Sequence, residues 1–438
     1  MGGTPVLPFS AMKESVVILG QGIIGLCSAW YAVQRGFDVT VIDRQPLPVQ
    51  GCSFGNAGMI VPSHFVPLAA PGMVALGLKW MWNPQSPFYI KPRLDGDLID
   101  WALKFWQAAT PEHVKRSAPV LRDLNLASRA CYEEVAALPG MDFGLVQKGL
   151  LMLCRTAKML EEEAHGAEKA RSLGVPAQVL DAAGAAAIDP GARMSIAGAV
   201  FYPKDCHLAP DRFMAALVAD CRARGVRFLS GQEVTGWDRE GGRLRAVRTT
   251  AGEVEGGQFV LAGGAWSGEA IRPLGLKLPM QAGKGYSLTL PEPRRLPEIC
   301  SILTEARVAV TPMLGRLRVG GTMEIAGLNT SISPRRVQGI IRALPQYYPD
   351  FCQGDFEGIK PWSGLRPCSP DGMPYLGRTG AATNLIVATG HSMMGLSLGP
   401  ITGQIVTRLL AGEAPGHPLE LLSPDRYAGR KMRMQSFV

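Results

Sequence analysis

Three glycines near the start of the chain have the spacing of a nucleotide-binding turn. Residues 16–44 read VVILGQGIIGLCSAWYAVQRGFDVTVIDR, in which an apolar run leads to Gly20, Gly22 and Gly25 and a second one ends at Asp43. Such glycines let a strand turn tightly into a helix whose free N–H groups face a pyrophosphate. An acid about 20 residues further on accepts hydrogen bonds from a ribose. The segment predicts a βαβ unit that holds NAD or FAD.

The elements that would position this turn are spread along the chain. The residues after Asp43 are rich in glycine, proline and small residues, which is typical of an extended loop over a ligand. Periodicity predicts helices and short strands further on, including a small antiparallel meander around Gly241 and Gly242 that returns to the main sheet at 259–262. The expected helices are 110–137, 157–173, 211–223, about 335–344 and about 399–410. The last of these follows a strand at 385–388 and a glycine turn at 390–395, so a second strand–turn–helix unit closes the chain.

Composition excludes several classes of protein. The chain has 438 residues, of which 47% are hydrophobic and 19% charged, as in an ordinary globular protein. Its nine cysteines form no CxxC pair, which fits a reducing cytoplasm and argues against a metal or iron–sulfur site. The net charge of +8 comes from dispersed basic residues without a nucleic-acid motif, so we expect no nucleic-acid partner. No secretory signal and no apolar run long enough to span a membrane is evident.

The choice between NAD and FAD depends on segments far from the first turn. Supporting glycine-rich or strand-end pieces recur at 232–234, 261–264 and 389–395, which suits a long cofactor crossing one discontinuous domain. A helix that begins after Gly395 would point its positive end at a flavin ring, where negative charge develops on reduction. Both features favour FAD.

Taken together, these motifs resemble FAD-dependent amino-acid oxidoreductases of the D-amino acid oxidase superfamily, and most of all the D-amino acid dehydrogenases. The similar region extends from residue 16 to residue 413. Its specific parts are GQGIIG with Asp43, SFGNAG with the proline-rich loop after it, KGYSLTLP, and the run WSGLRPCSPDGMPYLGR…TGHSMMG. Glycine and sarcosine oxidases share the GLRP and GH segments. Relatives often carry glutamate where this chain has Asp43, a change that leaves ribose binding intact.

The resemblance implies a mixed α/β (α+β) fold with two domains. One is a Rossmann-like FAD-binding domain built from discontinuous segments, which we expect at 14–80, 145–275 and 366–430. The other is an antiparallel-sheet substrate-binding or cap domain, expected at 81–144 and 276–365.

The resemblance also assigns residues to the cofactor. The first turn would bind the pyrophosphate, Asp43 the adenosine ribose, and the SFGNAG loop would cover the pyrophosphate and reach the flavin. Val234 would hold the adenine through its backbone, with Gly263 and Gly264 as the wall beside it, and the turn at 390–395 would line the flavin. The full expected set is Gly20, Gly22, Ile23, Ile24, Gly25, Asp43, Arg44, Ser53, Asn56, Ala57, Gly58, Met59, Val234, Ala262, Gly263, Gly264, Trp266, Gly390, Met394 and Gly395.

Arg366, in GLRP, resembles the arginine that holds the substrate carboxylate. A guanidinium suits this role because it binds a carboxylate bidentately and stays charged, although a structural ion pair is the alternative. Tyr286 would add a hydroxyl or else pack in the core. His391 looks catalytic, but we favour a hydrogen bond to flavin or backbone. His64 and Tyr375 are weaker candidates for the pocket wall.

The implied reaction moves a hydride from the substrate Cα to the flavin and gives an imino acid, which water converts to a 2-oxo acid and ammonia. The electrons then pass to a quinone or carrier protein, or to oxygen in a glycine-, sarcosine- or hydroxyproline-type enzyme. A non-catalytic flavoprotein scaffold is the alternative from another class.

The aromatic and basic stretch from Lys79 to Trp106 has two interpretations. It would dock a cytoplasmic enzyme on the inner face of the membrane, or, as we favour, pack as a lid on the substrate domain. Oligomeric state is left open.

Overall fold

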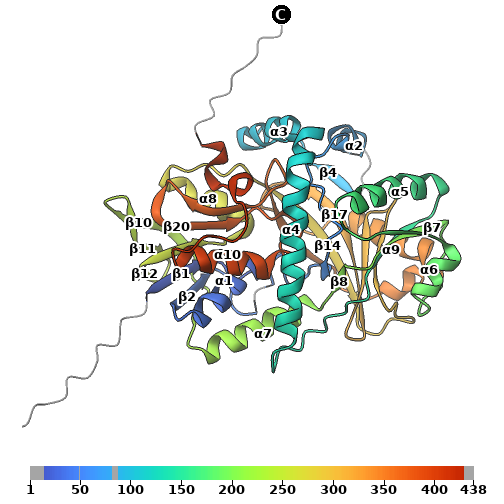
Figure 1. The fold of residues 1–438 in the computed structure, drawn as a ribbon, viewed down its shortest axis with the longest axis horizontal. Helices are drawn as coiled ribbons and strands as arrows, with labels where there is room; N and C mark the ends of the chain where they lie inside the picture. Colours follow the sequence, from blue (N-terminus) through green and yellow to red (C-terminus); the bar gives the residue numbers. More distant parts are fainter. Residues whose placement is uncertain (1–13, 49, 81–86, 429–438) are drawn as a thin grey trace, which may run out of the picture.

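The computed structural model describes residues 14–48, 50–80 and 87–428, which form two sheet-centred halves joined by helices (Figure 1). The first half is a six-stranded sheet in the order β19-β20-β13-β1-β2-β9, parallel except for β19. Its strands are β1 (Ser15–Leu19), β2 (Asp38–Asp43), β9 (Arg227–Ser230), β13 (Gln258–Leu261), β19 (Tyr375–Thr379) and β20 (Ala382–Thr389).

Helices cover this parallel sheet, and its central strands β1 and β13 are apolar after their first residue because both of their faces are buried. Helix α1 (Ile23–Gln34) packs between α10 (Gly399–Leu410) and α7 (Pro210–Ala223). The expected meander is confirmed: β10 (Val234–Glu240), β11 (Arg243–Thr249) and β12 (Gly252–Glu255) form a three-stranded sheet that leads back into β13.

The second half is a large mixed sheet in the order β18-β14-β17-β16-β15-β5-β7-β6, with β4 paired to β17. The pairings on both sides of β14 and β16 are antiparallel, as expected for the substrate domain. Its strands are β4 (Phe88–Ile90), β5 (Leu150–Cys154), β6 (Gln178–Asp181), β7 (Gly198–Tyr202), β14 (Gln281–Leu290), β15 (Cys300–Leu303), β16 (Val308–Met313), β17 (Arg316–Ile325) and β18 (Trp362–Cys368).

Helices flank this sheet: α2 (Met73–Trp80), α3 (Gly96–Ala108), α5 (Ala157–Ser172), α6 (Ala182–Ile188) and α9 (Pro334–Tyr347). The short helix α8 (Ser267–Ile271) packs against the meander, and a two-stranded ladder pairs β3 (Met59–Ile60) with β8 (Cys206–His207). The helices α4 (Pro111–Ala136), α5, α7, α9 and α10 end within three residues of the positions expected from periodicity.

The domain boundaries expected from the sequence differ from this arrangement in two places. Strands β5, β6 and β7 fall inside 145–275, which we assigned to the cofactor domain, yet β5 pairs with β15 in the large sheet. Helix α4 (Pro111–Ala136) falls inside 81–144, which we assigned to the cap, yet it packs on α10, and its Tyr132 hydroxyl donates to the Leu396 carbonyl at 2.6 Å. In Figure 1 this long helix crosses the middle of the molecule.

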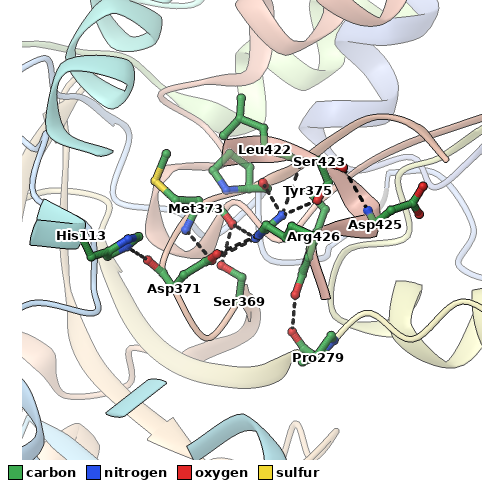
Figure 2. A network of polar contacts seen from close by, with 11 residues as sticks. His113, Pro279, Ser369, Asp371, Met373, Tyr375, Leu422, Ser423, Asp425 and Arg426 are labelled. Carbon is green, nitrogen blue, oxygen red and sulfur yellow. Dashed lines mark hydrogen bonds and ion pairs between the residues drawn. The ribbon is translucent and has the colours of Figure 1, made fainter. Parts of the chain in front are cut away.

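A network centred on Arg426 fixes the turn between β18 and β19 (Figure 2). The Arg426 guanidinium donates to both carboxylate oxygens of Asp371, at 2.7 and 2.9 Å, and to the Met373 carbonyl at 2.8 Å. It also lies 3.8 Å from the centre of the Tyr375 ring. A buried arginine in this setting satisfies the polar groups of a tight turn and locks the chain that follows Arg366.

Burial sets a pH dependence on this fold. His207 is buried at the β3–β8 ladder, and desolvation lowers its pKa to about 4, with a smaller contribution from the charge of Lys148. In the unfolded chain a histidine titrates near pH 6.5, so below that pH the unfolded state binds a proton that the folded state does not.

We therefore expect His207 to lower the free energy of unfolding by about 1 kcal/mol between pH 7 and 5.5. In denaturant titrations, the free energy of unfolding of the His207→Gln variant should decrease less on acidification than that of the parent chain. His165→Gln, on an exposed part of α5, is the control and should leave the loss unchanged. Equal slopes for parent and His207→Gln would contradict this account.

Candidate functional site

The main cavity lies at the carboxyl ends of β1, β2, β13 and β20, where parallel sheets bind ligands. Its volume is about 340 Å³, and it extends from the start of the meander, at β10, to the last turn before α10. The structure brings together most of the expected cofactor residues as its walls: Gly20, Gly22, Ile23, Ile24, Asp43, Arg44, Ser53, Asn56, Val234, Ala262, Gly263, Gly264, Trp266 and Gly395.

The first turn is built from backbones in close contact. Gly20 has φ +117°, and a Cβ there would lie 2.4 Å from the Ala262 carbonyl oxygen of β13's end. Gly25 does not line the cavity, because a Cβ at Gly25 would lie 1.9 Å from the Gly20 carbonyl oxygen. Gly22 begins α1 without a side-chain cap. The helix therefore presents N–H groups at its N-terminus, which suits a diphosphate.

Asp43 is held in place at the end of β2 by two backbone groups. Its Oδ2 accepts from the Gln21 N–H and its Oδ1 from the Gln45 N–H, both at 2.8 Å. Each carboxylate oxygen keeps a further acceptor position for a ribose hydroxyl. Beside it, the Arg44 guanidinium lies 3.7 Å from the centre of the Trp266 ring, a cation–π contact that forms part of the cavity wall.

The SFGNAG loop, residues 53–58, has an inner and an outer part. Ser53 and Asn56 line the cavity, and the Ser53 hydroxyl accepts from the Ile23 N–H at 3.1 Å, which ties the loop to the start of α1. Ala57, Gly58 and Met59 do not line the cavity. Gly58 has φ +78°, and a Cβ there would lie 2.3 Å from the Leu208 carbonyl oxygen, so its role is a close backbone contact.

The last turn places His391 and Gly395 in the wall, whereas Gly390 and Met394 lie outside it. Gly390 has φ +74°, and a Cβ there would lie 2.7 Å from the Tyr375 ring. The His391 Nε2 is 3.1 Å from the Thr402 hydroxyl, and burial lowers the pKa of His391 to about 3. The imidazole is therefore neutral at physiological pH and hydrogen-bonded within the protein.

Arg366 lies on the face of the large sheet that the SFGNAG loop covers. It pairs with Gly283, and its guanidinium occupies the space that a Cβ at Gly285 would need, 2.3 Å from Nη2. Its Nη1 donates to the Thr322 carbonyl at 2.7 Å. Among the described residues no carboxylate lies within ion-pair distance of Arg366, so its remaining donors are left for a ligand.

The structure does not bring Tyr286 to Arg366. Side chains alternate along a strand, so Tyr286 points away from the face that Gly285 and Ser287 share with the loop. It is only 1% exposed, packs in the core beneath α9, and donates to Glu324 Oε2 at 2.6 Å. The alternative interpretation of Tyr286, a core residue, fits these contacts.

The two weaker wall candidates are also placed elsewhere. The His64 Nδ1 lies 3.0 Å from the Ser63 hydroxyl, which donates to buried Asp205. The Tyr375 hydroxyl donates to the Pro279 carbonyl at 2.7 Å (Figure 2). The Tyr375 ring packs against Gly390. Neither residue is among those that line the main cavity.

Sequence reasoning missed two kinds of site residue. Thr235, Glu269 and Pro273 line the cavity near Val234, and Cys52 lines it just before the SFGNAG loop. Arg318 supports that loop from β17, through contacts between residues more than 250 positions apart. The sequence RLRVGG predicted a strand, but nothing in it indicated that the Arg318 side chain would bind the SFGNAG loop.

These residues fit FAD on structural grounds. At Gly22 a Cβ would meet only the Ser53 hydroxyl, at 3.7 Å, so the missing side chain leaves room in the cavity. The N-cap Gly22 has no side chain to cap α1, and Asp43 keeps free acceptor positions. No cluster of possible metal ligands occurs in the described parts of the chain.

Comparisons with known proteins agree with this site. A family model described as FAD dependent oxidoreductase matches residues 15–409. The D-amino acid dehydrogenase of Rhizorhabdus wittichii is 35% identical over 418 residues, covering 94% of this chain and 100% of the relative. That of Granulibacter bethesdensis is 32% identical, with coverage of 94% and 100%.

Solved structures show the same fold. Glycine oxidase from Geobacillus kaustophilus superposes with a TM-score of 0.75 at 24% identity, covering 95% of this chain and 100% of that protein. L-proline dehydrogenase from P. horikoshii superposes with a TM-score of 0.71 at 18% identity, covering 95% and 98%. The expected fold class and family resemblance are thus confirmed: the chain belongs to the family of FAD-dependent oxidoreductases, and FAD is its cofactor.

Proposed function

We propose that the chain oxidises D-amino acids to imino acids, which water then converts to 2-oxo acids and ammonia. The observation that carries this proposal is Arg366, a half-buried guanidinium without an acidic partner among the described residues, on the face of the sheet covered by the SFGNAG loop. Relatives with coverage of nearly the whole chain are named D-amino acid dehydrogenases, which supports this substrate class.

Arg366 would bind and orient the substrate carboxylate. Its Nη1 is already fixed on the Thr322 carbonyl, so the guanidinium has a defined orientation before substrate arrives. Bound FAD would accept a hydride from the substrate Cα. We assign no side-chain base: burial lowers the pKa of His391 to about 3, which makes its imidazole a weak base, and the Tyr286 hydroxyl is bound to Glu324.

Replacing Arg366 with alanine should raise KM for D-amino acids by roughly 100-fold or more, because charge-assisted hydrogen bonds to the carboxylate are lost. Flavin absorbance of the purified variant should stay at the parent level, since Arg366 does not line the main cavity. Arg366→Lys keeps the charge but not the bidentate geometry, so its KM should lie between those of the parent and of Arg366→Ala.

The matched control is Arg294→Ala, which removes an exposed arginine paired with Asp355. It should leave KM unchanged. Steady-state kinetics with an artificial electron acceptor measures both variants, and an unchanged KM in Arg366→Ala would contradict the carboxylate role.

We also propose that α3 serves both as a lid and as a docking surface for electron transfer to a membrane quinone. Its inner face holds Leu98 and Trp101, and the Trp101 indole, 3% exposed, donates to the Cys368 carbonyl at 2.9 Å. Its outer face exposes Ile99 by 54% and Trp106 by 60%, with Leu103 between them. These three residues follow helical spacing, as in helices that lie on a bilayer.

Each of the two interpretations of this stretch then applies to a different face of α3. The residues that face the sheet act as the lid that we favoured, and the exposed residues make the proposed contact with the cytoplasmic side of the membrane. The side chains of Lys79 and Trp80, and residue Trp82, lie outside the described residues. No helix among the described residues has the length and apolarity needed to cross a bilayer.

Changing Ile99, Leu103 and Trp106 together to serine should reduce co-sedimentation with anionic phospholipid vesicles several-fold, because the apolar face is lost. Quinone reduction with vesicle-bound quinone should fall in parallel, while turnover with a water-soluble dye stays within twofold. Val179→Ser, at another exposed apolar position, is the control. Peroxide production in air at the rate of dye reduction would instead favour an oxygen-using oxidase.

A further inference from the structure

Three consecutive carbonyls of the SFGNAG loop are bound by side chains of the large sheet. The Arg318 Nη1 donates to the Phe54 carbonyl at 3.0 Å and to the Asn56 carbonyl at 2.8 Å. The Ser287 hydroxyl donates to the Gly55 carbonyl, between these two, at 3.0 Å. The sheet of the substrate half thus holds a loop that forms part of the cofactor cavity.

This arrangement determines where the N–H groups of the loop point. In a trans peptide the C=O and the following N–H point in opposite directions, so a carbonyl bound to the sheet turns the next N–H away from it. The Asn56 N–H makes a long bond of 3.3 Å to the Ser53 carbonyl. The Gly55 and Ala57 N–H groups have no hydrogen-bond partner in the described part of the chain. The residues of this loop that line the cavity are Ser53 and Asn56, so the carbonyl contacts hold the loop with these two residues in the cavity wall.

Arg318 also places a positive charge under this loop. It is only 5% exposed, and its Nε donates to the Thr289 hydroxyl at 3.0 Å rather than to an acid. The charge of Asp211, on α7, also acts on Arg318, but the Asp211 carboxylate makes its hydrogen bonds to Arg316, at 3.1 and 3.3 Å. Burial lowers the pKa of Arg318 to about 10, so the guanidinium remains charged at neutral pH.

We propose that Arg318 is a positioning residue for the cofactor: it fixes the SFGNAG loop so that Ser53 and Asn56 form the cavity wall beside the FAD diphosphate, and it adds a buried cation without a carboxylate hydrogen-bond partner behind the loop. A nearby cation favours an anion. The proposal concerns cofactor binding alone, so it does not depend on which amino acid the enzyme oxidises.

The test uses holoenzyme and measures FAD release. The dissociation constant of FAD follows from the recovery of flavin fluorescence on serial dilution of Arg318→Met, Arg318→Lys and Ser287→Ala. We expect an increase on the order of 100-fold for Arg318→Met and roughly tenfold for Arg318→Lys, which restores the charge but cannot reach both carbonyls. Ser287→Ala, which leaves the charge in place, should give an increase of about three- to tenfold.

Arg316→Met is the matched control, since Arg316 is two residues away on the same strand, points at Asp211 and is more exposed. Its dissociation constant for FAD should stay within twofold of the parent value. Hydrogen exchange of the peptide that contains the SFGNAG loop, measured at saturating FAD, should be faster in Arg318→Met and unchanged in Arg316→Met.

A general loss of stability would not produce this pattern. It would lower the melting temperature at saturating FAD in all variants, and the FAD dissociation constants would not follow the order set by the loss of charge and of carbonyl contacts. If Arg318→Met does not fold, Arg318→Lys and Ser287→Ala decide the matter. FAD affinity within twofold of the parent in both of these, or an equal loss in Arg316→Met, would overturn the proposal.

Discussion

The cofactor site depends on the close approach of three backbones at the first turn. The end of β1, the start of α1 and the end of β13 meet at Gly20, Gly25 and Ala262, at separations that exclude any Cβ on the two glycines. Because the parallel sheet places the ends of β2 and β20 beside this turn, Asp43 and the last turn reach the same cavity. A single added methyl group at Gly25 would separate helix from strand and disturb every wall of the site.

Partly or fully buried arginines have different partners in the structural and functional parts of the molecule. Arg426 and Asp371 satisfy each other, and the surrounding carbonyls complete the network around a turn (Figure 2). Arg366 and Arg318 instead donate to backbone carbonyls and have no carboxylate partner within ion-pair distance among the described residues. A partly or fully desolvated cation without an anion is costly, and we therefore propose that an anionic ligand pairs with each of these arginines. Both arginines lie on the sheet covered by the SFGNAG loop.

Local signals in the sequence predicted the nucleotide-binding half well. Glycine spacing, apolar runs and helical periodicity are short-range features, and they located the first turn, the meander and α10. They did not locate β5, because its parallel partner β15 lies 150 residues further on and long-range pairing leaves no local pattern. The same limit applies to single residues. Tyr286 follows Gly285, which lies beside Arg366, but side chains alternate along the strand and the Tyr286 side chain lies on the opposite face, where its hydroxyl donates to Glu324.

Helix α3 carries aromatic residues both on the face that packs on the protein and on the face that is exposed. Asp95 caps its N-terminus by accepting from the Asp97 and Leu98 N–H groups. On its inner face Trp101 donates to the carbonyl of Cys368, two residues beyond Arg366. Trp106 faces outward because five residues at 3.6 per turn place it about 140° from Trp101 around the helix axis. Aromatic residues on both faces therefore could not be assigned to a lid or to a docking surface from their order in the sequence alone. A helix that packs beside the carboxylate-binding strand while exposing apolar side chains connects the proposed substrate pocket directly to the proposed docking surface.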